Sequence, residues 1–130
     1  MTGKSWPDIS GVVTMFYYED LPAAAAFYED RIGFERVMAF DGIVMLKLAE
    51  QSFLALVGAG YGSQQPIAGH NKGAILSIQT RQLESWHARL FALDVEGTGV
   101  GVQVGGGGRT LEFKIQDPEG YTIEFFEWIE

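Results

Sequence analysis

The strongest constraint on the fold of this chain is that its two halves contain the same order of predicted elements. Residues 9–18 are apolar and rich in β-branched and aromatic side chains, which is typical of a β-strand. A helix is predicted over residues 21–33, with Asp20 as its N-cap and Gly33 as its terminator. Further strands are predicted over three apolar runs, at residues 34–40, 43–49 and 52–58.

The second half repeats this order after a polar, glycine-rich stretch. Residues 72–80 are predicted to form a strand, and residues 83–93 a helix with one apolar face. The Asp-Pro-Glu-Gly sequence at residues 117–120 predicts a β-turn. Two further strands are predicted before this turn, at residues 98–104 and 109–117, and one after it, at residues 121–129.

Two copies of a β-α-β-β-β unit, each with a face that it cannot bury alone, are expected to pair. We therefore predict an α+β fold in which tandem βαβββ modules form a curled mixed sheet around a cleft, with helices on the outer faces. We expect one domain over residues 1–130, with modules at 9–59 and 72–129 and a linker at 60–71. The pattern leaves open whether the modules pair within one chain or by exchange between chains.

The net charge and composition limit the possible partners. The chain carries a net charge of −8, and an acidic surface repels phosphate backbones, so we expect no nucleic-acid partner. It contains no cysteine, which excludes disulfides and thiolate metal sites. Because it has neither an apolar run of about 20 residues nor an apolar signal segment, we expect no membrane partner and a cytoplasmic protein.

Two sequence strings carry a resemblance to a known family. The opening string VTMFYYEDLPAAAAFYEDRIGFE contains a strand, an Asp-Leu pair, a helix with Phe-Tyr and a Gly-Phe pair. The closing string FKIQDPEGYTIEFFEW contains Asp-Pro-Glu-Gly followed by Ile-Glu. On both strings the chain resembles the vicinal-oxygen-chelate superfamily of glyoxalases, bleomycin-resistance proteins and extradiol dioxygenases. The resemblance implies a glyoxalase-like fold, but not one activity, because the superfamily includes both metal enzymes and metal-free drug-binding proteins.

The resemblance also implies four metal-ligand positions on strands that face the cleft. In this chain they fall at Val13, near Ala55, at Gly73 and at Glu124. Three of these residues have no side-chain donor, whereas zinc sites use three or four N, O or S ligands. We therefore predict no metal and no cofactor, with Glu124 as the single retained ligand position.

Strand alternation predicts which side chains line the cleft beside these positions. They are apolar and aromatic groups around one acid, and such walls are typical of small-molecule pockets. The same residues could instead fill a core. The predicted ligand-binding residues are Val13, Met15, Tyr17, Phe53, Ala55, Phe113, Glu124, Phe126 and Trp128, and Phe113 is expected to extend the wall together with Phe40 and Met38.

Several hypotheses concern individual polar side chains. A buried Glu124 carboxylate needs a partner, which we expect to be a cationic ligand, Arg109 or Lys47, unless the residue serves as an acid or base. Tyr17 is a candidate hydrogen-bond donor at the far end of the cleft. Two histidines are alternatives: a displaced linker would bring His70 toward Glu124, while His87 is expected at the border between its helix and solvent.

Three functions follow from these residues and the resemblance. The favoured one is a metal-independent protein of the bleomycin-resistance type, which sequesters a hydrophobic or cationic aromatic compound and which the resemblance implies to be a homodimer. The second is a metal-dependent lyase, isomerase or dioxygenase of the glyoxalase superfamily. The third is a metal-free enzyme that uses Glu124 as a candidate catalytic residue for acid–base chemistry, with Tyr17.

Overall fold

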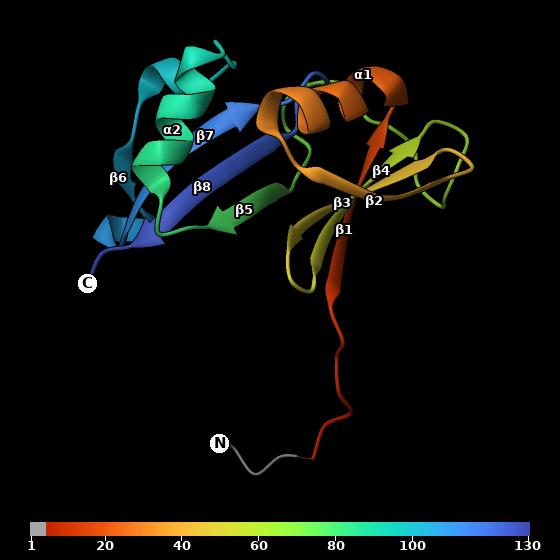
Figure 1. Ribbon diagram of the computed structural model, residues 1–130, viewed down its shortest axis with the longest axis horizontal. Helices are drawn as coiled ribbons and strands as arrows, with labels where there is room; N and C mark the ends of the chain where they lie inside the picture. The colour runs from red at the N-terminus through yellow and green to blue at the C-terminus, as the bar shows by residue number, and fades with distance from the viewer. Residues whose placement is uncertain (1–4) are drawn as a thin grey trace.

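The computed structural model describes residues 5–130, and Figure 1 shows them as two modules side by side. The order of elements is βαβββ in each module, as the sequence predicts. The first module consists of β1 (Val12–Tyr18), α1 (Leu21–Ala26), the π-helical segment η1 (Phe27–Ile32), β2 (Glu35–Phe40), β3 (Ile43–Ala49) and β4 (Ser52–Gly58). The second consists of β5 (Ile75–Gln79), α2 (Leu83–Ala92), the 3-10 turn η2 (Thr98–Val100), β6 (Gln103–Gly105), the 3-10 turn η3 (Gly106–Gly108), β7 (Thr110–Gln116) and β8 (Thr122–Trp128).

Each module forms a four-stranded mixed sheet with the same relative strand order. Sheet A has the order β1-β4-β3-β2 and sheet B the order β5-β8-β7-β6. The first strand of each module pairs in parallel with the last, and the other pairs are antiparallel. These two sheets confirm the predicted α+β class and its mixed sheet. β1 and β5 are therefore edge strands.

The first helix begins and ends where the sequence predicts. Asp20 is its N-cap, and the Asp20 Oδ1 atom accepts a hydrogen bond from the Ala23 N–H at 3.1 Å. Gly33 ends the helical segment in the left-handed region, with φ of 97°, which glycine adopts without steric cost.

One predicted strand is largely wrong. Of residues 98–104, only Gln103 and Val104 belong to a strand, β6. Thr98–Val100 instead form a 3-10 turn. Glycines with left-handed φ angles lie on both sides of this turn, Gly97 at 101° and Gly101 at 84°, and break the extended backbone. The Thr98 hydroxyl, which is buried, donates to the Val95 carbonyl at 2.6 Å and holds the turn.

The N-terminal segment also differs from the prediction, since the first strand begins at Val12 rather than at residue 9. Figure 1 shows residues 5–11 as an extended arm that leads away from the sheets. Ile9 on this arm is 85% exposed.

The helix-covered faces of the two sheets share one hydrophobic core. Phe16, Tyr18 and Leu56 contribute to it from sheet A, and Phe113 and Phe125 from sheet B. Figure 1 shows both helices toward the same side of the molecule, at the top of the view. The opposite face of each sheet carries no helix, and we call these the open face of sheet A and the open face of sheet B.

The buried carboxylate of Asp117 joins the two modules. Its Oδ2 atom accepts hydrogen bonds from the hydroxyls of Tyr18 and Tyr28, the latter at 2.7 Å. Its Oδ1 atom accepts the backbone N–H groups of Glu119 at 3.0 Å and Tyr121 at 2.9 Å. Both tyrosine hydroxyls come from the first module and both amides from the second, so one carboxylate holds the modules together.

The turn after Asp117 makes further contacts with the first module. The Tyr121 ring stacks on Phe16 with centroids 4.0 Å apart, and its hydroxyl donates to the Tyr17 carbonyl at 3.1 Å. The Glu119 carboxylate accepts the backbone N–H groups of Glu19 and Asp20, each at 2.8 Å.

No helix within residues 5–130 combines the length and the hydrophobicity that spanning a bilayer requires.

We expect Asp117→Ala to lower the free energy of unfolding by about 3 kcal/mol or more, because it leaves two buried tyrosine hydroxyls without their acceptor. Urea denaturation followed by circular dichroism measures the change. Asp30→Ala, the same substitution at an exposed position, is the control and is expected to change stability by less than about 0.5 kcal/mol. A loss below about 1 kcal/mol for Asp117→Ala would contradict the assigned role.

The same cluster predicts a loss of stability at high pH. Burial is the largest cause that raises the pKa of both Tyr18 and Tyr28 above the ordinary value of 10.0, and the nearby Asp117 charge raises both further. Both tyrosines ionise near pH 10 only when the chain unfolds, so stability is complete below that pH and falls above it by about 1.4 kcal/mol per pH unit for each. Tyr28→Phe should reduce this slope in denaturation curves from pH 9.5 to 11.5, whereas Tyr61→Phe, which changes a half-exposed ring, should keep it.

Candidate functional site

The open face of sheet A carries a row of methionines around the second family ligand position. In the strand register, Met15 of β1 lies beside Ala55 of β4, Ala55 lies beside Met45 of β3, and Met45 lies beside Met38 of β2. Met15 is 47% exposed and Met38 is 50% exposed, so thioether surface faces solvent. The chain has four methionines, and three of them form this row.

Other predicted site residues lie on the same open face. Val13 is paired with Phe53, and Tyr17 with Val57, on either side of the methionine row. Phe40, which the sequence predicts as an extension of the wall, is also on this face and is half-exposed. The open face of sheet A is therefore apolar over most of its area.

Tyr17 has a different environment from the one that the sequence predicts. Its side chain is buried, and its hydroxyl accepts the backbone N–H of Ser63 at 3.3 Å. Gly62 approaches the same ring so closely that a Cβ there would collide with it. The segment after β4 thus covers the Tyr17 end of the open face, and the apolar surface that remains exposed lies toward Val13.

The open face of sheet B is polar and contains Glu124. Register places Glu124 of β8 between Ser77 of β5 and Lys114 of β7. The Ser77 hydroxyl donates to Glu124 Oε1 at 2.6 Å, and the Lys114 Nζ atom lies 3.3 Å from Glu124 Oε2. The partner of Glu124 within the chain is therefore Lys114, and not Arg109 or Lys47 as the sequence suggests. Lys47 instead lies 3.6 Å from Glu50.

Lys114 links Glu124 to a second carboxylate. Its ammonium donates to Glu112 Oε2 at 2.5 Å, and the Thr110 hydroxyl donates to Glu112 Oε1 at 2.8 Å. The hydrogen bond from Lys114, followed by that from Thr110, lowers the pKa of the Glu112 carboxyl, and the bond to Glu112 raises the pKa of Lys114. The Glu112 carboxylate and the Lys114 ammonium therefore carry their charges over the physiological range.

Lys114, Glu112 and Ser77 are site residues that sequence reasoning missed. A signal for Lys114 was present, because the turn at residues 117–120 pairs Gln116 with Thr122 and so pairs Lys114 with Glu124. On the same face, Phe126 lies opposite Glu112, and the Phe126 ring contacts Trp128 with centroids 5.3 Å apart. These two predicted residues form the aromatic end of the open face of sheet B.

Phe113 is not on an open face, and the expectation that it extends the cleft wall is wrong. It pairs with Phe125, and the two rings stack with centroids 5.1 Å apart in the shared core. The physical reason is the two-residue period of a strand: Phe113 lies between Glu112 and Lys114, so its ring points to the opposite side.

The histidines have structural partners. The His70 Nδ1 atom lies 3.3 Å from Gln116 Oε1, so the linker brings this ring to β7 but not into contact with Glu124. The His87 Nε2 atom lies 2.9 Å from the Thr98 carbonyl oxygen, and its ring packs edge-on against Phe113. His87 thus joins α2 to the turn at residues 98–100.

The residues at the four family ligand positions do not fit a metal ion. Val13, Ala55 and Gly73 have no donor atoms in their side chains, and the Glu124 carboxylate is already hydrogen-bonded to Ser77 and lies 3.3 Å from the Lys114 ammonium. Nor do any three His, Asp or Glu side chains in the stretch from residue 5 to residue 130 form a group that could hold a metal.

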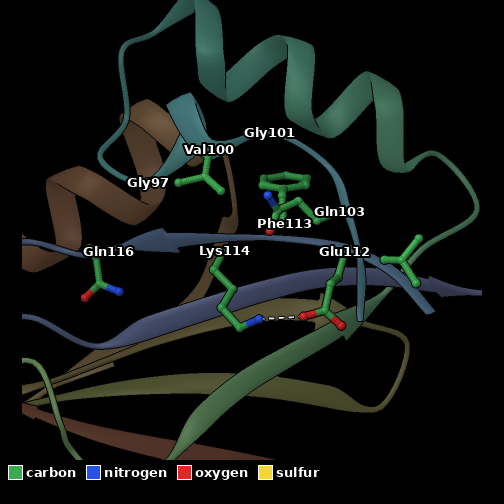
Figure 2. A pocket seen from close by; sticks show the side chains of 9 residues that line it. Gly97, Val100, Gly101, Gln103, Glu112, Phe113, Lys114 and Gln116 are labelled. Carbon is green, nitrogen blue, oxygen red and sulfur yellow. Dashed lines mark hydrogen bonds and ion pairs between the residues drawn. The ribbon is translucent and has the colours of Figure 1, made fainter. Parts of the chain in front are cut away.

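Two hollows lie beside the sheets. A groove of about 410 Å³ lies between the edge strands β1 and β5. Its lining combines Phe53 and Ser77 from the open faces with Leu76 and Ile78 from the helix-covered face of sheet B. This volume is within the range of small-molecule pockets. A smaller hollow of about 270 Å³ lies beside β6 and β7. Figure 2 shows Glu112 and Lys114 on one side of β7, and Phe113 and Val100 on the other.

Comparisons with solved structures show what the fold is similar to. A lactoylglutathione lyase from Agrobacterium tumefaciens matches with a TM-score of 0.72 at 23% identity, over 94% of this chain and 96% of that one. TnmS3, an antibiotic binding protein from Streptomyces sp. CB03234, matches with a TM-score of 0.69 at 17% identity, over 97% of this chain and 99% of that one. At these identities the likeness shows the fold alone.

A third solved structure, the glyoxalase / bleomycin resistance protein from Catenulispora acidiphila, matches with a TM-score of 0.68 at 21% identity, over 90% of this chain and 96% of that one. No curated protein matches the sequence. The family model for the Glyoxalase/Bleomycin resistance protein/Dioxygenase superfamily matches residues 12–125, which is most of the chain. Together with the paired βαβββ modules, this match shows that the chain belongs to the glyoxalase/bleomycin resistance protein/dioxygenase superfamily.

Proposed function

We propose that this chain is a metal-independent small-molecule-binding protein of the bleomycin-resistance type, which sequesters a hydrophobic or cationic aromatic compound. One observation carries the proposal: Glu124, at the single family ligand position that keeps a donor, is held by Ser77 and Lys114. A metal enzyme of this family needs several donors at these positions, and this chain has apolar residues and a glycine there.

The surface around the lost metal positions supports an aromatic ligand. Methionine side chains are flexible and polarizable, and they make favourable contacts with aromatic rings of different shapes. Met15, Met45 and Met38 form such a surface beside Phe53, and Phe53 lines the groove between the modules. The fold is one that an antibiotic-binding protein also uses.

The third function considered, acid–base catalysis by Glu124 and Tyr17, has less support. The Tyr17 hydroxyl is bonded to the Ser63 backbone and covered by the segment after β4, while Glu124 is paired with Lys114. Both groups already have partners within the chain, so sequestration is the function that we retain. The cysteine-free composition suits the reducing cytoplasm, where we place the protein as part of this proposal.

A thermal-shift screen of aromatic metabolites and antibiotics, run with EDTA or with added Zn²⁺, Ni²⁺ or Mn²⁺, tests the proposal. We expect an aromatic ligand to stabilise the protein equally in all arms, by about 2.7 kcal/mol at a hundredfold excess over Kd. Metal alone should leave the melting temperature unchanged. Stabilisation by metal alone, with about one equivalent of metal retained after dialysis, would contradict the proposal in favour of a metal enzyme.

We further propose a homodimer in which a second copy covers the open face of sheet A. Large exposed apolar patches on soluble proteins usually mark interaction sites, and this patch includes Val13, Met15, Met38 and Phe40. The adjacent arm presents Ile9 to solvent, away from its own sheets. In a twofold dimer this same apolar patch of each copy can meet its counterpart, which satisfies the reciprocal contacts of such an interface.

We expect Phe40→Lys to weaken self-association at least tenfold, because it places a charge in the apolar patch. Sedimentation equilibrium measures the dimer dissociation constant. Phe91→Lys is the matched control, since Phe91 lies on α2 and is 58% exposed, compared with 50% for Phe40. A wild-type chain that stays monomeric at high micromolar concentration, or equal effects of both substitutions, would count against this interface.

A further inference from the structure

We propose that Glu112, Lys114 and Glu124 on the open face of sheet B form the recognition site for a protonated amine on the ligand. This inference rests on the proposed function and names the chemical class of the ligand, an aromatic or apolar amine. We call the three residues the carboxylate–lysine cluster. Glu112 and Lys114 come from β7 and Glu124 from β8.

The backbone leaves room for this cluster. Gly105 of β6 has an extended backbone, with φ of −138° and ψ of −164°, which any residue can adopt. Its lack of a side chain matters for space, because a Cβ at this position would collide with the Glu112 carboxylate. The carboxylate therefore lies over Gly105, where the Thr110 hydroxyl fixes it at 2.8 Å.

The charge of the cluster favours a cation. Two carboxylates surround one ammonium, so the cluster keeps a net charge of about −1 when all three groups are ionised. The side chains of Glu112 and Glu124 are only 14% and 18% exposed, which weakens solvent screening of that negative charge. The net charge of −8 on the whole chain acts in the same direction.

Hydrogen-bonding capacity leads to the same conclusion. A carboxylate can accept about four hydrogen bonds. Glu112 accepts bonds from Thr110 and Lys114, and Glu124 accepts one from Ser77 and faces Lys114. Acceptor positions thus remain on both carboxylates, whereas two of the three donors of Lys114 are directed at them. The cluster offers more to a ligand that donates hydrogen bonds than to one that accepts them.

An apolar surface adjoins the cluster. Ser77, which bonds Glu124, also lines the groove between the modules, and Phe53 lines the same groove from sheet A. Figure 2 shows Glu112 and Lys114 pointing away from the core side of β7, toward the open face. A ligand with an aromatic ring in the groove can therefore place an ammonium group beside Glu124.

Three probes of matched shape test the inference by isothermal titration calorimetry at neutral pH and low salt. They are naphthylmethylamine, naphthylmethanol and naphthylacetate, which carry a cation, a neutral hydroxyl and an anion on the same ring. We expect the amine to bind about tenfold more tightly than the alcohol, and the anion to bind most weakly. Added salt should reduce this preference, because screening weakens charge interactions.

Variants separate the cluster from its surroundings. We expect Glu112→Gln and Glu124→Gln each to weaken binding of the amine about tenfold and to leave the alcohol unchanged. Lys114→Gln should strengthen binding of the amine, because it removes the competing cation. Glu127→Gln is the matched control: Glu127 also lies on β8, but pairs with Leu111 on the opposite side of the sheet, so every affinity should stay the same.

The outcomes distinguish this inference from the proposed function. Equal affinity for amine and alcohol, or weaker binding of the amine by Lys114→Gln, would overturn amine recognition while leaving an aromatic-binding protein. Tighter binding of naphthylacetate, abolished by Lys114→Gln, would instead identify Lys114 as an anion receptor. Failure of all three probes to bind would count against the proposed function and, with it, this inference.

Discussion

The buried Asp117 carboxylate is the group on which both the packing of the modules and the geometry of the site depend. It accepts two tyrosine hydroxyls from the first module and two backbone amides from its own turn. The hydrogen bonds from these backbone amides hold the turn that connects β7 to β8. This turn sets the register that places Lys114 opposite Glu124. One acid therefore determines how the modules meet and which side chains face each other on the open face of sheet B.

The chemistry of the two open faces is different, and the contrast explains why we favour ligand binding over metal chemistry. The open face of sheet A has thioether and aromatic groups where the family pattern calls for donors at Val13 and Ala55. The open face of sheet B keeps Glu124 but pairs it with Lys114. The Lys114 ammonium thus lies beside the single carboxylate at these positions, and the apolar surface of sheet A suits the body of an organic molecule.

Most of the fold could be predicted because its signals are local. The Asp20 cap, the Gly33 terminator and the two apolar runs at residues 43–49 and 52–58 specify their elements without help from distant residues. The run at residues 98–104 could not be predicted, because Val100, Val102 and Val104 give it the apolar alternation of a strand. A left-handed glycine at each end of its first half and the Thr98 hydrogen bond to Val95 turn that half into a helical bend instead.

The sequence by itself determined which residues of one strand share a face, because side chains alternate with a period of two; Val13, Met15 and Tyr17 follow this rule. It could not determine which residue of a neighbouring strand lies beside them. That depends on register, and a shift of one residue moves a side chain to the other face. The sequence therefore predicts the wrong face for Phe113, and it suggests Arg109 or Lys47 as the cation beside Glu124 where the structure has Lys114. The turn at residues 117–120 indicates that Lys114 pairs with Glu124, but only the tertiary structure, in which the buried aspartate holds this turn, fixes that pairing.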